Sequence, residues 1–183
     1  MERAEAVIGR AAAEDPGHFA VHRLLQLMDP IADRRFVAAA EAVTELSPFT
    51  LNAWMSRPDI VPCRELLMVR ATMEPGFCHP FHRHPTREEI IYVLSGQAEQ
   101  WCGDRHRVLK PGEMVLIPAG EVHGTYNPFR EPVVFLAILA PAGAAGPDMV
   151  DVSGEAPWVG KREGLGLRAC VTRADPAVSR APG

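Results

Sequence analysis

Hydrophobic and polar residues follow one another in short runs between about residue 35 and residue 140. The clearest runs cover 65–73, 89–94, 98–102, 113–117 and 133–139, and all but 98–102 are rich in Val, Ile and Leu. Proline and glycine interrupt the sequence between them at short intervals. Short strands separated by such turns are typical of an antiparallel sandwich or barrel. The pattern therefore predicts an all-β body.

The two ends of the chain show different patterns. Asp15 and Pro16 are typical of a helix start, and apolar residues recur after them at roughly helical spacing until Pro30. We therefore expect short N-terminal helices in a 1–30 extension, a barrel over 31–141 and a final segment over 142–183. Trp158 is expected to dock that segment on the body to about residue 160, with a flexible, frayed tail beyond it.

Composition and charge exclude several classes of function. Of the 183 residues, 19 are Lys or Arg and 23 are Asp or Glu, which gives a net charge of −4. A mildly acidic chain is a poor candidate for nucleic acid binding, which needs a basic surface. The longest uninterrupted apolar run, 133–140, is far too short to span a membrane as a helix.

The N-terminus and the cysteines indicate a cytoplasmic protein. The opening residues carry acids early and lack the apolar stretch of a signal peptide. The four cysteines form no C-x-x-C pair, so neither a zinc ribbon nor a thioredoxin motif is present. We therefore expect reduced thiols.

Three histidines and one acid form the most informative group of residues. His82 and His84 are two apart on an extended segment, so both should point to the same face of a strand. After the turn-prone Pro85 the chain can reverse, which lets Glu89 face the same interior, and His123 follows much later. Imidazole and carboxylate groups bind Fe, Mn, Ni, Cu, Co or Zn. Four such ligands around an octahedral ion leave two positions for substrate, water or dioxygen.

The spacing of these residues resembles a known family. Residues 76–96 read G-x(5)-H-x-H-x(4)-E-x(6)-G, and residues 112–127 read G-x(5)-P-x-G-x(2)-H-x(3)-N. These resemble the two signature motifs of the cupin superfamily. The resemblance implies a double-stranded β-helix (a jelly-roll barrel), a homodimer, and metal binding by His82, His84, Glu89 and His123. Glu88 is an alternative acid, but only Glu89 keeps six residues before Gly96.

Strand alternation suggests three further residues that contact a substrate. Cys78 shares the parity of the two histidines unless a bulge intervenes, Gln100 falls on an inward position, and Arg70 would bind a carboxylate if its face were interior. Each has a plainer interpretation. Cys78 would be a small core residue, Gln100 a residue of the rim, and Arg70 a partner in an exterior ion pair.

The resemblance favours a metal-dependent enzyme that acts on a small polar molecule. Dioxygenase-like chemistry is our first expectation, followed by isomerase, decarboxylase or lyase chemistry, with Glu89 as a base if it can leave the ion. The alternatives are a non-catalytic protein that binds or senses a small ligand or a metal, and a hydrogen-bonded cluster without metal. The apolar stretch SPFTLNAW within 31–60 is expected to pair a barrel edge, in the same subunit or in the homodimer.

Overall fold

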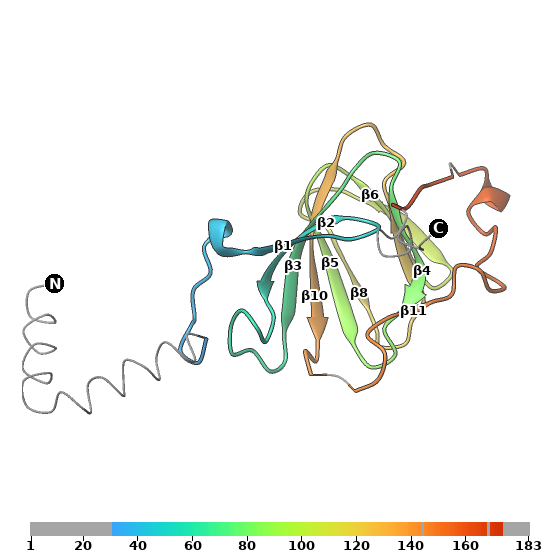
Figure 1. Cartoon of the computed structure of the whole chain (residues 1–183). Helices are drawn as coiled ribbons and strands as arrows, with labels where there is room; N and C mark the ends of the chain where they lie inside the picture. Colours follow the sequence, from blue (N-terminus) through green and yellow to red (C-terminus); the bar gives the residue numbers. More distant parts are fainter. Residues whose placement is uncertain (1–30, 144, 168, 174–183) are drawn as a thin grey trace, which may run out of the picture.

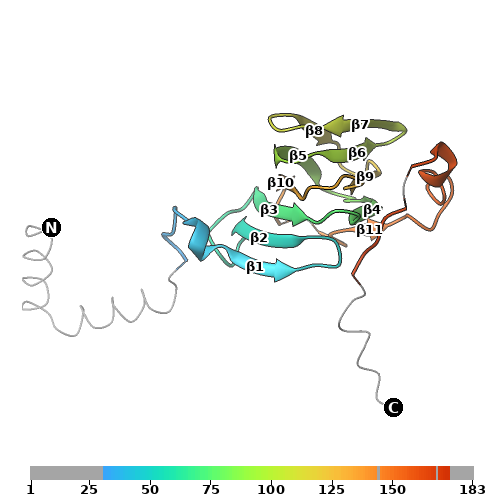
Figure 2. The same ribbon diagram turned by 90° about the horizontal axis from the view of Figure 1, so that it is seen from above.

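Two antiparallel sheets face each other and form the body of the protein (Figures 1 and 2). The computed structural model describes residues 31–143, 145–167 and 169–173. The six-stranded sheet has the order β1 (Val43–Leu46), β2 (Leu51–Ser56), β3 (Leu67–Met73), β10 (Val133–Ala140), β5 (Glu88–Ser95) and β8 (Met114–Ile117). The five-stranded sheet has the order β11 (Val150–Asp151), β4 (Cys78–Arg83), β9 (His123–Tyr126), β6 (Ala98–Cys102) and β7 (Arg105–Leu109). This is the predicted all-β jelly roll.

The alternation of the sequence decides which side chains fill the space between the sheets. Along β3 and β10 every second residue is buried, and Met73, Val93 and Val133 are completely enclosed. The five strands predicted from the hydrophobic runs are confirmed as β3, β5, β6, β8 and β10. Two short 3-10 helices, η1 (Ala39–Glu41) and η2 (Glu163–Leu165), lie outside the sheets. The helix expected before Pro30 lies outside the described residues.

A glycine is required where β5 turns into β6. Gly96 has a φ of +72°, and a Cβ atom there would lie 2.3 Å from the carbonyl oxygen of Pro132. The turn therefore packs directly on the backbone that leads into β10, which leaves no room for a side chain. This close approach sets β5, the strand that carries Glu89, against β10.

The C-terminal segment covers the outer face of the five-stranded sheet (Figure 2). Phe81, Trp101, Tyr126 and Val152 form a second buried cluster there, and Trp158 packs against it. Arg162, just beyond the expected docking segment, is buried and ion-paired to Glu99. The tail beyond residue 173 lies outside the described residues.

One pair of cysteines departs from the expectation of reduced thiols. Cys78 and Cys170 form a disulfide across 92 residues of sequence, while Cys63 and Cys102 are free. Next to it, Phe77 and Val171 pair through an isolated bridge. The segment after η2 is thus held against the start of β4. No helix in the described part of the chain is long and apolar enough to cross a membrane.

Candidate metal centre

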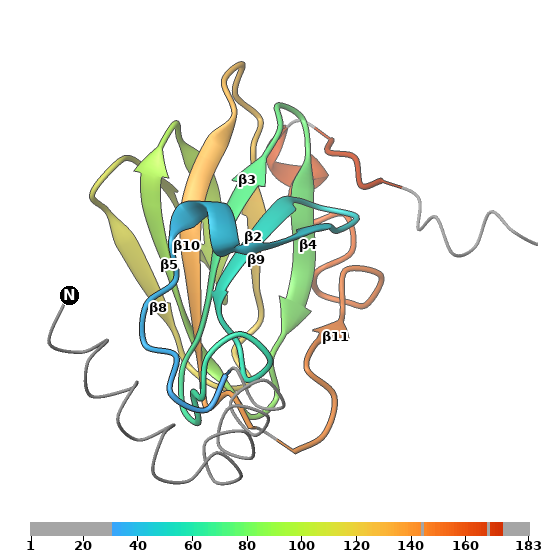
Figure 3. The same cartoon turned by 60° about the vertical axis from the view of Figure 1, so that its left-hand side comes forward.

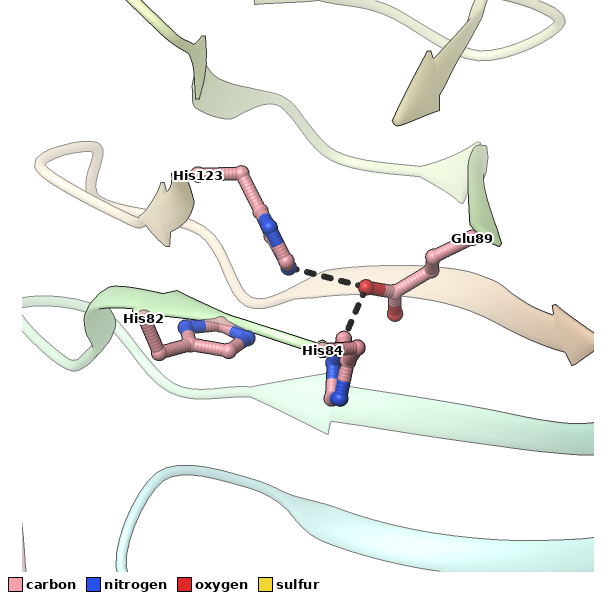
Figure 4. Close-up of side chains that lie close together, drawn as sticks. All are labelled: His82, His84, Glu89 and His123. Atoms are coloured by element: carbon pink, nitrogen blue, oxygen red, sulfur yellow. Dashed lines mark ion pairs between the residues drawn. The ribbon is translucent and has the colours of Figure 1, made fainter. Parts of the chain in front are cut away.

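The fold brings the four predicted ligands together between the sheets (Figure 4). His82 lies on β4, His84 follows that strand directly, Glu89 lies on β5 and His123 on β9. Each offers one ligand atom, and all four atoms lie within 4.8 Å of one another. The four side chains are almost completely buried, with exposed fractions from 1% to 9%.

Strand pairing explains how two distant motifs meet. β4 and β9 are antiparallel neighbours, and His82 lies directly opposite His123 in their register. Residues in such a pair point to the same side of the sheet and approach closely. The ring centroids of His82 and His123 are 4.1 Å apart. Glu89 reaches the same point from the facing sheet.

Backbone carbonyl groups orient all three histidine rings. The Nδ1 atoms of His82, His84 and His123 lie within hydrogen-bond distance of the carbonyl oxygens of Pro80, Asp148 and Glu121, respectively. A carbonyl oxygen only accepts hydrogen bonds, so each Nδ1 carries the proton. In the neutral ring, Nε2 then carries the lone pair. Metal-binding histidines are typically held in this way.

The atoms that meet in the middle of the cluster are all acceptors. Nε2 of His123 and Nε2 of His84 lie 2.9 Å and 3.4 Å from Oε2 of Glu89. Among the described residues, Nε2 of His82, Nε2 of His123 and Oε2 of Glu89 are buried without a hydrogen-bond partner. Buried polar atoms of a folded protein are normally paired. A cation at this point would satisfy all of them, so the cluster fits a divalent metal.

The electrostatics of the metal-free cluster agree with this interpretation. Burial opposes the charge on Glu89, but the close approach of the His123 and His84 rings to its carboxylate outweighs burial and holds the pKa of the carboxyl group well below the usual range. Burial alone would lower the pKa of His84, yet its contact with Glu89 raises it. The pKa of His82 is lowered, first by burial and then by the neighbouring histidines. The carboxylate is therefore ionised and ready to bind a cation.

A fourth imidazole that alternation did not predict also reaches the interior. Strict alternation from His82 and His84 would place His79 on the opposite face, but the β4–β9 register shifts between His79 and His82. The bulge turns His79 inward, where its ring stacks on His82 at 3.8 Å and on Phe49 at 4.2 Å. Burial, reinforced by nearby histidines, lowers the pKa of His79 to about 3, so its ring is neutral. Bulges are hard to read from sequence because one extra residue reverses all later parity.

The cluster opens onto a cavity of about 230 Å³. Apolar side chains form most of its wall, among them Trp54, Ile91, Phe135 and Leu139. The turn between β1 and β2 adds Ser47, Phe49 and Thr50, and Met149 contributes from the loop before β11. Figure 3 shows the β1–β2 hairpin crossing in front of the barrel. The cavity is larger than the roughly 150 Å³ apolar site that holds benzene in an engineered protein.

The three predicted substrate contacts lie elsewhere. Cys78 belongs to the outer cluster and is bonded to Cys170, because the bulge breaks its parity with His82. Arg70 is exposed, since Val69 and Ala71 take the inward positions of β3. Gln100 does point inward and is buried, but it does not line this cavity. It accepts a hydrogen bond from Thr125, whose side chain does.

The cupin domain family matches residues 69–139 of this chain. The match covers the centre of the barrel and, together with the fold, supports assignment to the cupin superfamily. Two solved structures have a similar fold at 24% identity. The polyketide cyclase RemF from Streptomyces resistomycificus has a TM-score of 0.56 over 68% of this chain and 90% of its own. A double-stranded β-helix protein from Klebsiella pneumoniae has a TM-score of 0.52 over 64% of this chain and 91% of its own.

Curated relatives match over shorter stretches. The dimethylsulfoniopropionate lyase DddQ of Ruegeria pomeroyi is 44% identical over 54 residues, which are 29% of this chain and 26% of that protein. Germin-like protein 3-8 of rice is 29% identical over 100 residues, covering 50% of this chain and 44% of that protein. The matched regions thus span less than half of each relative. They support a cupin with a metal-binding cluster and leave its reaction open.

Proposed function

We propose that the protein is a metal-dependent enzyme that carries out a dioxygenase-like reaction on a small molecule held in the cavity. The observation that carries this proposal is the orphaned set of acceptors on the cavity wall. Four protein ligands leave two positions of an octahedral ion, and the cavity offers the space into which those positions would open. The alternative of a hydrogen-bonded cluster without metal does not account for buried acceptors that face one another.

The residues of the site have distinct roles in this proposal. His82, His84, Glu89 and His123 would hold a divalent ion of Fe, Mn, Ni, Cu, Co or Zn, which supplies a Lewis acid and a template for the substrate. Glu89 would accept a proton from the substrate if its carboxylate leaves the ion. The apolar wall limits water near the reacting atoms, which strengthens electrostatic interactions there. Because that wall is apolar, we expect a substrate with a polar, metal-binding end and an apolar body.

A metal-dependent lyase is the second candidate. The 44% identity to part of a dimethylsulfoniopropionate lyase favours it. A lyase needs no dioxygen, since a base removes a proton and a leaving group departs. The same four ligands and the same cavity would serve, so the two candidates differ in their requirement for oxygen.

Metal analysis and oxygen dependence test the proposal. The protein is purified without a metal-binding tag, and metal content is compared with that of His82→Ala. We expect about one equivalent in the wild type and almost none in the variant. The Fe form is then assayed with small diketones, phenols, thiols and sulfonium carboxylates, with and without oxygen. Oxygen uptake with product supports the dioxygenase, whereas product without oxygen supports the lyase. Ligand binding with no turnover for any metal indicates a binding protein and rejects both.

We also propose that the protein is a homodimer in the cytoplasm. All four residues of the edge strand β1 are exposed, and Leu46 is 64% exposed, which suits pairing with a second copy. Native mass measurement should give twice the chain mass, and a monomer at micromolar concentration would reject the dimer.

Thiol counting on protein taken directly from cells tests the location, since a reducing compartment would leave Cys78 and Cys170 titratable.

A further inference from the structure

The cavity wall carries a single charged group. Among the described residues that line it, Glu89 is the one carboxylate, and Lys and Arg are absent; the remaining titratable side chains are histidines. The other lining residues are apolar, or neutral and polar. The charge of whatever occupies the cavity must therefore be balanced by the metal cluster itself.

A buried guanidinium group close enough to act on His84 is already engaged. Arg87 is buried, and its Nη1 lies 2.9 Å from Oδ1 of Asp148. Its Nε and Nη2 donate hydrogen bonds to the carbonyl oxygens of Pro141 and Ala142. Its charge is thus matched by a carboxylate outside the cavity. It does not serve as a counter-charge for a ligand.

His79 supplies no counter-charge either. Both faces of its ring are covered, by Phe49 and by His82, and its Nε2 lies 3.1 Å from the sulfur of Met149. A thioether sulfur is a weak acceptor that carries no charge. The ring is half-buried between two neutral rings, and a positive charge there would have no acidic partner in contact, which is unfavourable.

These observations define the charge of the ligand. A divalent ion with Glu89 and neutral histidines leaves a single positive charge in a largely apolar space. A monoanion brings the total to zero, a dianion leaves one uncompensated negative charge, and a neutral molecule leaves the positive charge in place. Uncompensated buried charge is costly. We propose that the cavity selects a small monoanion with an apolar body, an inference that rests on the proposed metal-dependent function.

Three probes of similar size test this selection. The full-length protein is loaded with Co²⁺, and uptake is followed by visible absorption. Butyrate, succinate and 1-butanol are then titrated by calorimetry. We expect butyrate to bind at least about tenfold more tightly than either of the others, because the dianion and the alcohol both leave a net charge. Equal or tighter binding of succinate, or no binding of butyrate at millimolar concentration, overturns the inference.

Adding a positively charged side chain to the cavity wall should reverse the preference for butyrate over succinate. Asn52 lines the cavity, so Asn52→Arg is expected to shift the preference at least about tenfold toward succinate, while the neutral Asn52→Leu keeps the preference for butyrate. Met149→Lys, at a side chain that is 37% exposed, provides a second variant if Asn52→Arg does not fold. An unchanged order in the folded cationic variant rejects the inference alone. Failure of the wild type to take up Co²⁺ instead rejects the proposed function together with it.

Discussion

Two buried glutamates lie on opposite sides of the barrel wall and have opposite surroundings. Glu99 points outward from β6, accepts hydrogen bonds from Nε and Nη2 of Arg162 at 2.7 Å and 2.8 Å, and accepts a third from Trp101. Glu89 points inward from β5, and its Oε2 faces histidine nitrogens that are themselves acceptors. Their exposed fractions, 3% and 6%, are similar.

The difference separates a structural carboxylate from one that is arranged for a cation. Burial opposes ionisation of Glu99, but hydrogen bonds from Arg162 and Trp101 outweigh burial and lower its pKa. The chain therefore supplies the counter-charge for Glu99 from its own C-terminal segment. For Glu89 the four-residue cluster contains no fixed cation, which leaves that role to a metal. Burial alone does not distinguish the two groups, whereas the identity of the neighbouring atoms does.

The largest effect is expected when the satisfied pair is broken. Arg162→Met should lower the free energy of unfolding by about 3–5 kcal/mol, because Glu99 would be left charged and buried. Urea unfolding at neutral pH measures the change. The matched control is Lys161→Met, whose ammonium pairs with the exposed Asp104, and it should lose only about 1 kcal/mol or less. A loss below about 1 kcal/mol for Arg162→Met would show that the segment contributes little to the fold.

Replacing Glu89, on the inner side of the barrel, is expected to affect metal binding strongly and folding stability only slightly. Glu89→Gln should weaken metal binding by about 100-fold or more, since it removes the one anionic ligand. In the metal-free protein the same change should alter the free energy of unfolding by less than about 1 kcal/mol or raise it, because the amide can donate to an Nε2 lone pair. Competitive chelator titration and urea unfolding measure the two effects. A metal-free variant as unstable as Arg162→Met would show that Glu89 is as structural as Glu99.

Lowering the pH should reduce the stability of the fold through His79, on the inner side of the barrel. The pKa of His79 lies near 3 in the folded state against 6.5 for an ordinary histidine, so the unfolded chain binds the extra proton first. The stability that His79 contributes is complete above about pH 6.5 and is lost as the pH falls toward 3. In metal-free protein, His79→Phe should make the decline between about pH 6 and pH 4 shallower by up to about 1.4 kcal/mol per pH unit. Parallel profiles for variant and wild type would contradict the buried, neutral state of His79.

A smaller loss of stability than that of Arg162→Met is expected at the buried hydrogen bond between Thr125 and Gln100. Thr125 donates to the side-chain oxygen of Gln100 at 2.6 Å, and both residues are buried. Thr125→Val should lower the free energy of unfolding by about 1–3 kcal/mol, because the buried acceptor is left unpaired. The double variant Thr125→Val/Gln100→Leu should recover part of that loss. Thermal unfolding of the three proteins decides, and additive losses would mean that the two side chains are not coupled.

Much of the barrel was predictable because it follows from local alternation. The inward residues of β5, including Glu89 and Ile91, are the ones that the period of two selects. The spacing of the second motif identified His123 as a member of the cluster, although no local pattern pairs it with His82. The strands β1, β2, β4, β7, β9 and β11 were less evident, since they are short or carry polar residues on both faces.

The sequence by itself determined the class of fold, the positions of the main strands and the four residues of the buried histidine and glutamate cluster, because these depend on periodicity and spacing. Only the tertiary structure decided that His79 turns inward, that Cys78 faces outward to Cys170, and that Arg162 returns to neutralise Glu99. Those outcomes depend on one bulge and on contacts between residues far apart in the chain. No local pattern encodes them, since each is settled by which buried atoms find a partner once the sheets have closed.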